Sequence, residues 1–411
     1  MKSVYEEQSL CCGCAACAYV CPKKAISLQE DSCGFRYPEI DQNLCIDCGA
    51  CRKVCSFISP IDRNYVNNCY AAQCNDPVLL QGASSGGIFS ALAEGFLKDG
   101  GLVCGARMEK KNGKFVNEHI LIDSMKELYK LQGSKYVQSN LDMVFGIIAE
   151  SINRGKQIVF SGTPCQNAAM KKVFRKYKDQ IFFIDIVCHG VPNIFFFNDY
   201  ISEREKQIGK EIIEYSFRDK SQGWNQLSGH FTVRTDDRYT ERVNNSSKTE
   251  SFYRLFLDGE IYRDSCYECP YTNTERVGDL TICDYWGIQT YSSELLEENG
   301  GPFDIQKGIS GLLVNTSRGA ELLKKYGYKL EIYPVEIEKV KIRNTQLREP
   351  AQYSKLRNLI LQAYRCEGYS AVEDVFQKWL RCYKVRAYAK RTASKILPMS
   401  LKNSIKKRLY H

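Results

Sequence analysis

The sequence predicts a small α+β domain at the N-terminus, a larger α/β domain after it, and a helical, basic C-terminal region. Three observations indicate this division. Ten of the 20 cysteines fall within the first 55 residues, strand and helix patterns alternate through the middle of the chain, and residues 381–411 hold ten Lys and Arg but no Asp or Glu. The 411 residues, 44% of them hydrophobic, suffice for two or three domains. We place these domains at 1–60, 61–345 and 346–411.

The sequence has the features of an intracellular protein. Its first residues, MKSVYEEQSLCC, lack the apolar segment of a signal peptide. No stretch approaches the roughly 18 uninterrupted apolar residues of a transmembrane helix. Cysteines at metal-ligand spacing imply a compartment that keeps thiols reduced. We therefore expect a cytoplasmic protein.

A duplicated cysteine motif, C-x2-C-x2-C-x3-C, dominates the first domain. Each cysteine of the second copy lies 34 residues after its counterpart; the members are Cys11, Cys14, Cys17 and Cys21, then Cys45, Cys48, Cys51 and Cys55. Three thiolates on one tight loop bind three irons of a [4Fe–4S] cubane, and in two-cluster ferredoxins the fourth cysteine binds the other cluster. We therefore expect Cys55 to complete the first cluster and Cys21 to complete the second.

Zinc is the alternative metal for these thiols. Structural zinc usually takes two separated C-x2-C pairs, so a duplicated triple run fits it poorly. The first domain is thus predicted to be a ferredoxin-like 2[4Fe–4S] domain, with a hairpin or turn insert at residues 30–41. Cys12 has Ile46 at the equivalent position of the second copy, and we interpret Cys12 as a spare thiol.

A loop of small residues precedes a predicted helix in the larger domain. The loop consists of Gly82, Ser84, Ser85, Gly86 and Gly87. Apolar residues then recur at helical spacing from Ile88 to Leu97, and Gly100 ends the helix. Such a loop exposes backbone N–H groups at a helix N-terminus, which suits a phosphate or an electron-rich ring. A cap and a turn without a ligand is the alternative.

A strand–helix–strand unit follows. The pattern predicts a buried strand at Ile158–Ser161, a helix from about Asn167 and a second strand at Ile181–Val187, which is typical of parallel strands in a mixed or parallel sheet. Cys165 and Cys188 follow the ends of these two strands. Because parallel strands end at one edge of a sheet, we expect the two thiols to lie close together.

Cys266 and Cys269 form a further C-x2-C pair. Together with Cys165 and Cys188 they supply four thiols, which is the ligand count of a third [4Fe–4S] cluster. The alternative is that Cys165 and Cys188 are buried apolar residues and that the pair binds zinc or nothing. The spacing alone leaves both interpretations open.

Nine segments occur in a characteristic order between residue 11 and about residue 288: CCGCAACAYVCP, CIDCGACRKVC, GASSGGIFSALAEG, GSKYVQS, SGTPCQNAAMK, VCHGVP, FRDKSQGW, CYECPY and GDLTICDYWGI. In this series the chain resembles the coenzyme F420 hydrogenase/dehydrogenase beta-subunit family, in the long form with an N-terminal 2[4Fe–4S] ferredoxin domain. The resemblance covers roughly two-thirds of the chain.

The resemblance implies an FAD site and a third [4Fe–4S] cluster beside it. The flavin-lining residues that it implies are Ser84, Ser85, Gly86, Gly87, Gly133, Ser134, Lys135 and Tyr136. It assigns the third cluster to Cys165, Cys188, Cys266 and Cys269. Cys283 departs from the pattern, since we expect glycine at this position, and it puts the ligand set in some doubt.

The function implied by the resemblance is that of an iron–sulfur flavoprotein oxidoreductase. It would pass electrons between a hydride-type donor or acceptor at FAD and the [4Fe–4S] clusters, and onward to a redox partner protein or a small molecule. The alternative is a flavin-free, ferredoxin-type electron carrier that docks on a separate enzyme. Use of F420 itself is expected from the family name alone, and no catalytic residue is assigned.

The basic tail, residues 381–411, alternates basic and apolar positions. Leu401, Ile405 and Leu409 repeat at a spacing of four and line one face of a predicted helix. Such a helix suits peripheral binding to an anionic membrane surface; docking on an acidic partner and packing on the body are the alternatives. No nucleic-acid-binding motif accompanies the charge, so we expect no nucleic acid.

Overall fold

The computed structural model describes residues 3–236, 239–246 and 248–396, with the backbone alone for residues 386–396. The chain forms two compact units, Met1–Tyr353 and Ser354–His411. The first unit contains both the cysteine-rich N-terminal region and a large sheet. The domain boundaries drawn from the sequence at 60 and 345 stay predictions.

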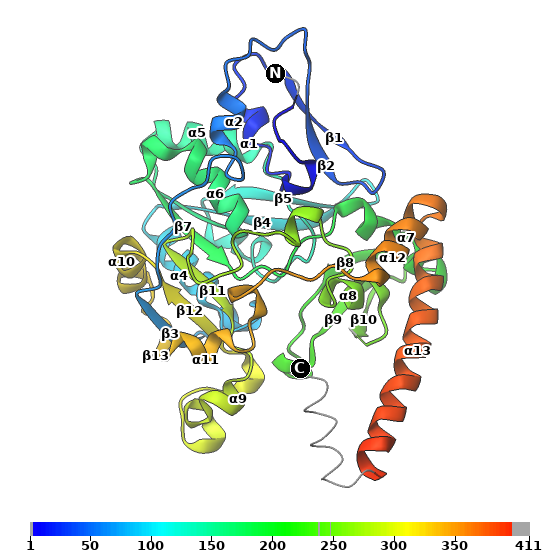
Figure 1. Cartoon of the computed structure of the whole chain (residues 1–411). Coiled ribbons are helices and arrows are strands. Elements are labelled where there is room, and N and C mark those ends of the chain that lie inside the picture. The colour runs from blue at the N-terminus through cyan, green and yellow to red at the C-terminus, as the bar shows by residue number, and fades with distance from the viewer. Residues whose placement is uncertain (1–2, 237–238, 247, 397–411) are drawn as a thin grey trace. The chain divides into compact units, whose positions relative to one another are not determined.

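The N-terminal region consists of a hairpin and two short helices (Figure 1). Strand β1 (Ile26–Glu30) pairs antiparallel with β2 (Arg36–Ile40). Helices α1 (Ala16–Tyr19) and α2 (Ala50–Val54) each contain the third cysteine of one motif. The insert between the motifs is therefore a hairpin, and the Asp31 carboxylate stabilises its turn by accepting two backbone N–H bonds.

A mixed eight-stranded sheet, of order β13-β3-β12-β11-β7-β6-β4-β5, forms the body of the first unit. Its strands are β3 (Asn68–Cys74), β4 (Leu102–Lys111), β5 (Lys114–Ile122), β6 (Ile158–Gly162), β7 (Ile181–Ile186), β11 (Leu280–Asp284), β12 (Ser310–Val314) and β13 (Leu330–Pro334). The pairs β4–β6, β6–β7 and β7–β11 are parallel. The other adjacent pairs of this sheet are antiparallel. The predicted α/β class with a mixed or parallel sheet is confirmed as a mixed sheet.

The predicted strand–helix–strand unit is present as β6, α6 (Pro164–Val173) and β7. The helix begins three residues before the predicted Asn167. Thr163 caps it in a capping box with Gln166, whose side chain accepts a bond from the Thr163 N–H. The earlier start places Cys165 in the first turn of the helix.

Helices cover both faces of the sheet. Alternate residues of a strand face opposite sides, and on β6 Val159 belongs to one hydrophobic core and Phe160 to another. Helices α4 (Ile88–Lys98) and α10 (Ser317–Tyr326) close the first core. Helices α5 (Val144–Asn153) and α6 close the second. The burial of both faces is typical of parallel strands.

The cysteine-rich region shares the second of these cores. Ala16, Cys17 and Val54 are buried there together with Phe145 of α5. The ring of Tyr19 stacks on Phe145, with ring centroids 5.0 Å apart and an interplanar angle of 20°. The N-terminal cysteines are therefore packed directly against the helices that cover the sheet.

A second, smaller sheet was not predicted from the sequence. It has the order β10-β9-β8, and its strands are β8 (Ile212–Ser216), β9 (Ser228–Arg234) and β10 (Thr240–Ser246). Helices α7 (Ile194–Ile208) and α8 (Ser251–Leu257) join it in an aromatic cluster. The cluster contains Phe196, Phe197, Tyr200, Tyr215, Phe217 and Phe252. The remaining short helices are α3 (Pro77–Gln81), α9 (Ile288–Tyr291) and α11 (Ile337–Lys341).

The described part of the second unit, residues 354–396, is helical, as predicted. It contains α12 (Lys355–Glu367) and α13 (Tyr369–Ile396), with Gly368 between them at a φ of +77°. The apolar tail positions 401, 405 and 409 lie outside the described residues. In the part of the chain that the structure describes, no helix is both long and apolar enough to span a membrane.

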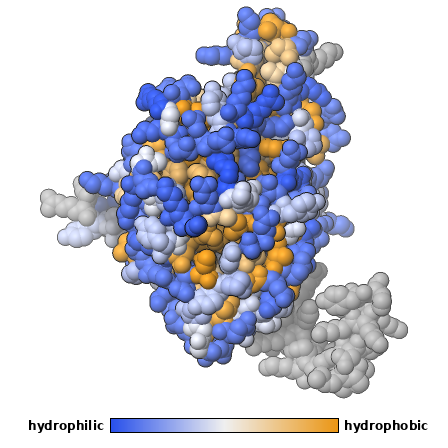
Figure 2. All heavy atoms as spheres, turned by 90° about the vertical axis from the view of Figure 1, so that its left-hand side faces the viewer, coloured by the Kyte–Doolittle hydropathy of each residue, from blue (hydrophilic) through white to orange (hydrophobic). Residues whose placement is uncertain are grey.

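Hydrophilic side chains cover most of the face drawn in Figure 2, and hydrophobic residues gather in smaller areas near its middle. Some large apolar side chains of the first unit are exposed. Leu44 and Ile46, which flank Cys45, are 51% and 57% exposed, and Cys48 is exposed as well. The second cysteine motif therefore lies at the surface.

Replacing Phe145 with Ala should lower the free energy of unfolding by about 3–5 kcal/mol, because it empties a core that the cysteine-rich region and α5 share. Urea unfolding of the reconstituted protein measures this loss. Met143→Ala is the matched control, since Met143 directly precedes α5 and is 74% exposed. The control should change the free energy by less than about 0.5 kcal/mol, and equal losses in both variants would contradict the shared core.

Candidate functional site

The two cysteine motifs line two separate cavities. The first cavity, of about 170 Å³, is lined by four motif cysteines: Cys11, Cys14, Cys17 and Cys55. The second, of about 20 Å³, is lined by the other four: Cys21, Cys45, Cys48 and Cys51. Each motif thus contributes three thiols to one cavity and its fourth thiol to the other.

The two cysteine loops repeat one backbone conformation. Gly13 and Ala15 have φ values of +65° and +64°, and Asp47 and Gly49, at the equivalent positions of the second copy, have values of +53° and +71°. The left-handed backbone conformation at these positions turns the chain tightly around the thiols. The N–H of Gly13 points at the sulfur of Cys11, 3.4 Å away. Such amide–sulfur bonds are one of the features that set cluster potentials.

A third group of thiols lines a larger cavity, of about 330 Å³. Cys165 lies in the first turn of α6 and Cys188 lies two residues beyond β7, so adjacent parallel strands bring both to one edge of the sheet. Cys266 and Cys269 lie on the loop that follows α8, and both act electrostatically on Cys188, as does Cys165. The structure therefore brings together the four cysteines that the resemblance assigns to a third cluster.

Burial controls the protonation of these thiols. It raises the pKa of Cys266 and of Cys269 to about 12, and it raises the pKa of Cys188 well above the ordinary value. Cys165 differs, because a hydrogen bond with the Cys12 thiol is the main cause that lowers its pKa to about 7. A metal binds thiolates, so loading of this site must release protons.

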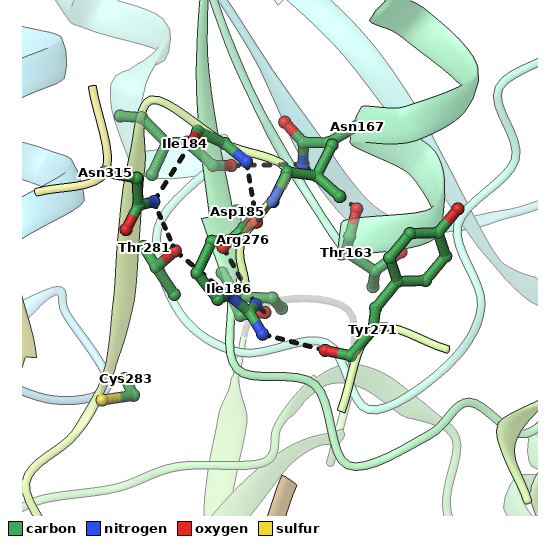
Figure 3. A network of polar contacts seen from close by, with 12 residues as sticks. Thr163, Asn167, Ile184, Asp185, Ile186, Tyr271, Arg276, Thr281, Cys283 and Asn315 are labelled. Carbon is green, nitrogen blue, oxygen red and sulfur yellow. Dashed lines mark hydrogen bonds and ion pairs between the residues drawn. The ribbon is translucent and has the colours of Figure 1, made fainter. Parts of the chain in front are cut away.

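A buried ion pair anchors the loop that carries Cys269 (Figure 3). Arg276 Nη2 lies 3.0 Å from Asp185 Oδ1, and neither side chain is more than 1% exposed. The other carboxylate oxygen of Asp185 accepts two backbone N–H bonds from the same loop, and Arg276 Nη1 donates to the carbonyl oxygen of Tyr271. Asp185 lies on β7, so the pair ties the strand that leads to Cys188 to the loop that follows Cys269.

The two loops expected to line a flavin site meet at one wall of the large cavity. Ser84 Oγ accepts bonds from the N–H and the hydroxyl of Ser134, at 2.7 and 2.9 Å. The ring of Tyr136 stacks on Phe256 with centroids 4.3 Å apart. Seven of the eight expected residues line this cavity: Ser84, Ser85, Gly87, Gly133, Ser134, Lys135 and Tyr136.

Gly86, the eighth, packs against the sheet instead. Its N–H donates to Ser310 Oγ at 2.9 Å, and its carbonyl oxygen accepts from the N–H of Cys74 at 2.7 Å. A Cβ atom on Gly86 would collide with the carbonyl oxygen of Ala72. Glycine is therefore required here because strands β3 and β12 approach the loop closely.

Two partly buried lysines lie beside these loops. Lys135 Nζ donates to the carbonyl oxygen of Gln132 at 2.7 Å, and burial lowers the pKa of Lys135 to about 7. Lys220 Nζ donates to the carbonyl oxygens of Ser85 and Lys307, at 3.1 and 2.8 Å, and burial lowers its pKa to about 8. Lys220 was not predicted as a site residue, although it lies in the segment FRDKSQGW. An anion beside either lysine would favour its charged form.

An ion pair that the sequence analysis also missed lies at the same cavity. Arg218 Nη1 lies 3.0 Å from Asp284 Oδ2, and the Arg218 side chain is 3% exposed. Trp224 donates to the other carboxylate oxygen at 3.1 Å and stacks on Trp286, with ring centroids 4.5 Å apart. Arg218 and Trp224 both belong to FRDKSQGW, so this segment was the signal for the pair.

Cys283 lines the cavity but is not grouped with the four thiols. Its thiol donates to the carbonyl oxygen of Gly311 at 3.6 Å. Burial raises its pKa, and Cys69 and Asp284 are the groups that raise it further. Figure 3 shows Cys283 apart from the buried ion-pair network. A cysteine at position 283, where glycine was expected, therefore does not change the group formed by Cys165, Cys188, Cys266 and Cys269.

Among the described residues, no three Cys, His, Asp or Glu side chains converge as ligands of one metal ion. A cubane does not require such convergence, because each of its four thiolates binds a different iron. The residue types, the spacing and the grouping of the thiols into fours are those that [4Fe–4S] clusters use.

Comparison with known families agrees with the fold and the thiol groups. Residues 10–57 match the family described as the 4Fe-4S dicluster domain. Residues 69–145 and 155–341 match the N-terminal and C-terminal parts of the coenzyme F420 hydrogenase/dehydrogenase beta subunit. The chain therefore belongs to the coenzyme F420 hydrogenase/dehydrogenase beta-subunit family, in a form that has an N-terminal iron–sulfur domain.

Among solved structures, the chain is similar to one chain of the F420-reducing [NiFe] hydrogenase complex from Methanosarcina barkeri, determined after xenon derivatization. The match covers 78% of this chain and 92% of that chain, with 17% sequence identity and a TM-score of 0.43. A likeness at this level carries no argument about function. The curated proteins contain no match.

His119 lies at the wall of the cavity as a buried, neutral imidazole. Its Nε2 donates to the carbonyl oxygen of Ser161 at 3.0 Å, and its Nδ1 accepts from the hydroxyl of Ser139 at 2.9 Å. We assign this tautomer because a carbonyl oxygen can only accept. Burial lowers the pKa of His119 to about 4.

His119 should make the protein less stable as the pH falls. In the unfolded chain His119 binds a proton near pH 6.5, and in the folded chain only near pH 4. The contribution of the neutral ring to the free energy of unfolding is therefore complete above pH 6.5 and is lost as the pH falls toward 4. We expect this residue to account for about 2 kcal/mol of the unfolding free energy lost between pH 7 and pH 5. Urea titrations at the two pH values, on wild type and His119→Gln, measure the difference. Equal pH dependence in both proteins would show that His119 is not buried as a neutral ring.

Proposed function

We propose that this protein is an iron–sulfur flavoprotein oxidoreductase that passes electrons between a hydride donor or acceptor and a one-electron redox partner. One observation carries the proposal: a single cavity is lined both by the small-residue loops and by the third group of thiols. The family, whose members are beta subunits of hydrogenases and dehydrogenases, supports an electron-transfer role of the oxidoreductase type.

The residues of the large cavity fit an FAD. A volume of about 330 Å³ is within the range of about 300–1,000 Å³ found for cofactor pockets. The N-terminus of α4, which begins after Gly87, and the amine of Lys135 provide favourable surroundings for phosphate groups, and Lys220 binds the carbonyl oxygen of Ser85 in the same loop. A flavin at this site would exchange two electrons as a hydride, and a [4Fe–4S] cluster beside it would accept one at a time.

The thiol groups divide into three ligand sets. In our proposal, Cys11, Cys14, Cys17 and Cys55 hold one cluster, and Cys21, Cys45, Cys48 and Cys51 hold the second. Cys165, Cys188, Cys266 and Cys269 hold the third. The grouping of these residues around three cavities supports the assignment.

The second N-terminal set is the place at which we expect a redox partner to approach. Cys48 is exposed, and the apolar residues Leu44 and Ile46 of the same motif are exposed as well. The partner is a protein or a small molecule that accepts or donates single electrons. A cytoplasmic location and binding of the tail to a membrane surface remain predictions.

Anaerobically purified and reconstituted protein should contain about twelve irons and one acid-extractable flavin per chain, because each of three clusters holds four irons. Cys165→Ser should lower the iron content to about eight and leave the two N-terminal clusters in place. Cys283→Ser is the matched control. It alters a thiol of the same cavity, and serine can make the same bond to Gly311, so it should retain all the iron.

The wild-type result alone separates the proposal from its alternative. About eight irons and no flavin would leave only the N-terminal motifs redox-active. The protein would then be a flavin-free electron carrier that docks on a separate enzyme. Loss of iron from Cys283→Ser but not from Cys165→Ser would contradict the third ligand set.

Lys135→Met should weaken flavin binding about tenfold or more, because the loss of a charge-assisted hydrogen bond costs about 1.5–3 kcal/mol. Fluorescence titration of the flavin-depleted protein with FAD measures the affinity, and the iron content should not change. Lys130→Met is the control, since Lys130 forms an ion pair with Glu127 and does not line the cavity. Equal affinities of Lys135→Met and wild type would remove Lys135 from the flavin site.

A further inference from the structure

The large cavity and the cavity of the first motif share a wall. Cys12 and Phe57 line both of them. The thiol of Cys12 interacts with Cys14, which belongs to the first motif, and with Cys165, which belongs to the third group. The peptide of Cys11 and Cys12 therefore lies between two of the proposed cluster sites.

Arg263 fixes the position of this peptide by hydrogen bonds. Its Nη1 donates to the carbonyl oxygen of Cys11 at 2.9 Å, and its Nη2 donates to that of Arg36 at 2.8 Å. Its Nε donates to Gln138 Oε1 at 3.1 Å, and Gln138 Nε2 donates in turn to the carbonyl oxygen of Cys12 at 2.9 Å. Two consecutive carbonyl groups of the cysteine loop are thus fixed by two side chains of the body.

The cysteine loop is shaped to admit this arginine. A Cβ atom at Gly13 would lie 2.6 Å from Arg263 Nη2 and 3.0 Å from the carbonyl oxygen of Arg36. Gly13 also has a φ of +65°, which other residues adopt at a cost. Glycine at this position suits the left-handed turn and leaves room for the guanidinium.

Arg263 also belongs to the third thiol group through its backbone. Its carbonyl oxygen accepts the N–H of Cys266 at 3.0 Å, three residues further on. Its own N–H donates to the carbonyl oxygen of Val191, three residues after Cys188. One residue is thus bonded to the peptide of the first motif and to the loops that carry two thiols of the third group.

The charge of Arg263 has no carboxylate partner among the residues that the structure describes. The residue is 1% exposed, its hydrogen-bond acceptors are neutral, and the rings of Tyr37 and Phe35 lie 4.6 and 5.2 Å from its guanidinium carbon. A guanidinium stays charged, and an unpaired charge in the interior is costly unless an anion lies close to it. Clusters held by thiolates are such anions.

We propose that Arg263, positioned by Gln138, acts on both of the clusters between which it lies. Its fork fixes the Cys11–Cys12 peptide that separates the two sites, and its positive charge makes reduction on both sides more favourable. The proposal rests on the proposed function for the presence of the clusters. Reduction adds one electron and neither forms nor breaks a bond, so Arg263 alters only the free energy of that step.

Arg263→Gln tests the charge. In anaerobic redox titrations of the full reconstituted chain, followed by electron paramagnetic resonance, we expect the equilibrium constant for reduction to fall about tenfold, which is about 60 mV for a one-electron couple. Arg263→Lys keeps the charge and loses the fork. It should restore most of the potential, which a merely structural role would not predict.

Gln138→Glu gives a second test that keeps the arginine in place. The change keeps the size of the side chain and sets a carboxylate against Arg263 Nε, so it should compensate the charge and lower the potentials in the same direction. It also removes the donor to the Cys12 carbonyl oxygen, and Gln138→Met, which removes that donor without adding a charge, measures this separate effect. Arg36→Gln is the control. The side chain of Arg36 is already paired with Asp142 at 2.6 Å, and it is the main-chain oxygen of Arg36 that accepts the bond from Arg263, so the potentials should not change.

The iron content of each variant is measured before its potentials. Unchanged potentials in Arg263→Gln and Gln138→Glu, with all iron retained, overturn the proposal. If Arg263→Gln does not retain its iron, Gln138→Glu decides the question. A wild-type protein with only about eight irons overturns the proposed function as well, and that failure is seen before any variant is made.

Discussion

The large cavity depends on one buried ion pair, between Asp185 and Arg276. Two opposite charges in the interior persist only when hydrogen bonds satisfy their remaining groups, and loss of either partner typically costs about 3–5 kcal/mol. Here Asp185 accepts two backbone N–H bonds, and Arg276 donates to Thr281 and to three carbonyl oxygens. Because the pair joins strand β7 to the loop after Cys269, it holds two thiol-bearing segments in register.

Buried hydrogen bonds also fix the position of the N-terminal region on the body of the first unit. Ala16 and Cys17 share a hydrophobic core with α5, and this contact is not directional. Arg263 and Gln138 add direction, because each bonds to a carbonyl oxygen of the first cysteine loop. Apolar packing thus brings the two regions together, and buried hydrogen bonds determine how the loop faces the cavity.

Several contacts that line the cavity join residues far apart in the chain. Arg263 and Cys11 are 252 positions apart, Lys220 and Ser85 are 135 apart, and no short-range pattern connects either pair. At Gly86 the local pattern was visible, but it did not predict the role of each residue. The segment predicted a ligand-binding loop. Because strands β3 and β12 lie close to Gly86, this glycine packs against the sheet, whereas Ser84 and Ser85 line the cavity.

Features that local spacing encodes could be predicted from the sequence. The cysteine runs indicated cluster chemistry because a cubane of this type takes three of its four ligands from one tight loop. Apolar periodicity indicated β6, α6 and β7 because the buried residues of a strand and of a helix recur at different spacings. Three features could be seen only in the folded chain: Cys12 lies between two thiol groups, the small aromatic sheet exists, and Arg218 pairs with Asp284. These features depend on packing between distant segments, and no single segment contains that information.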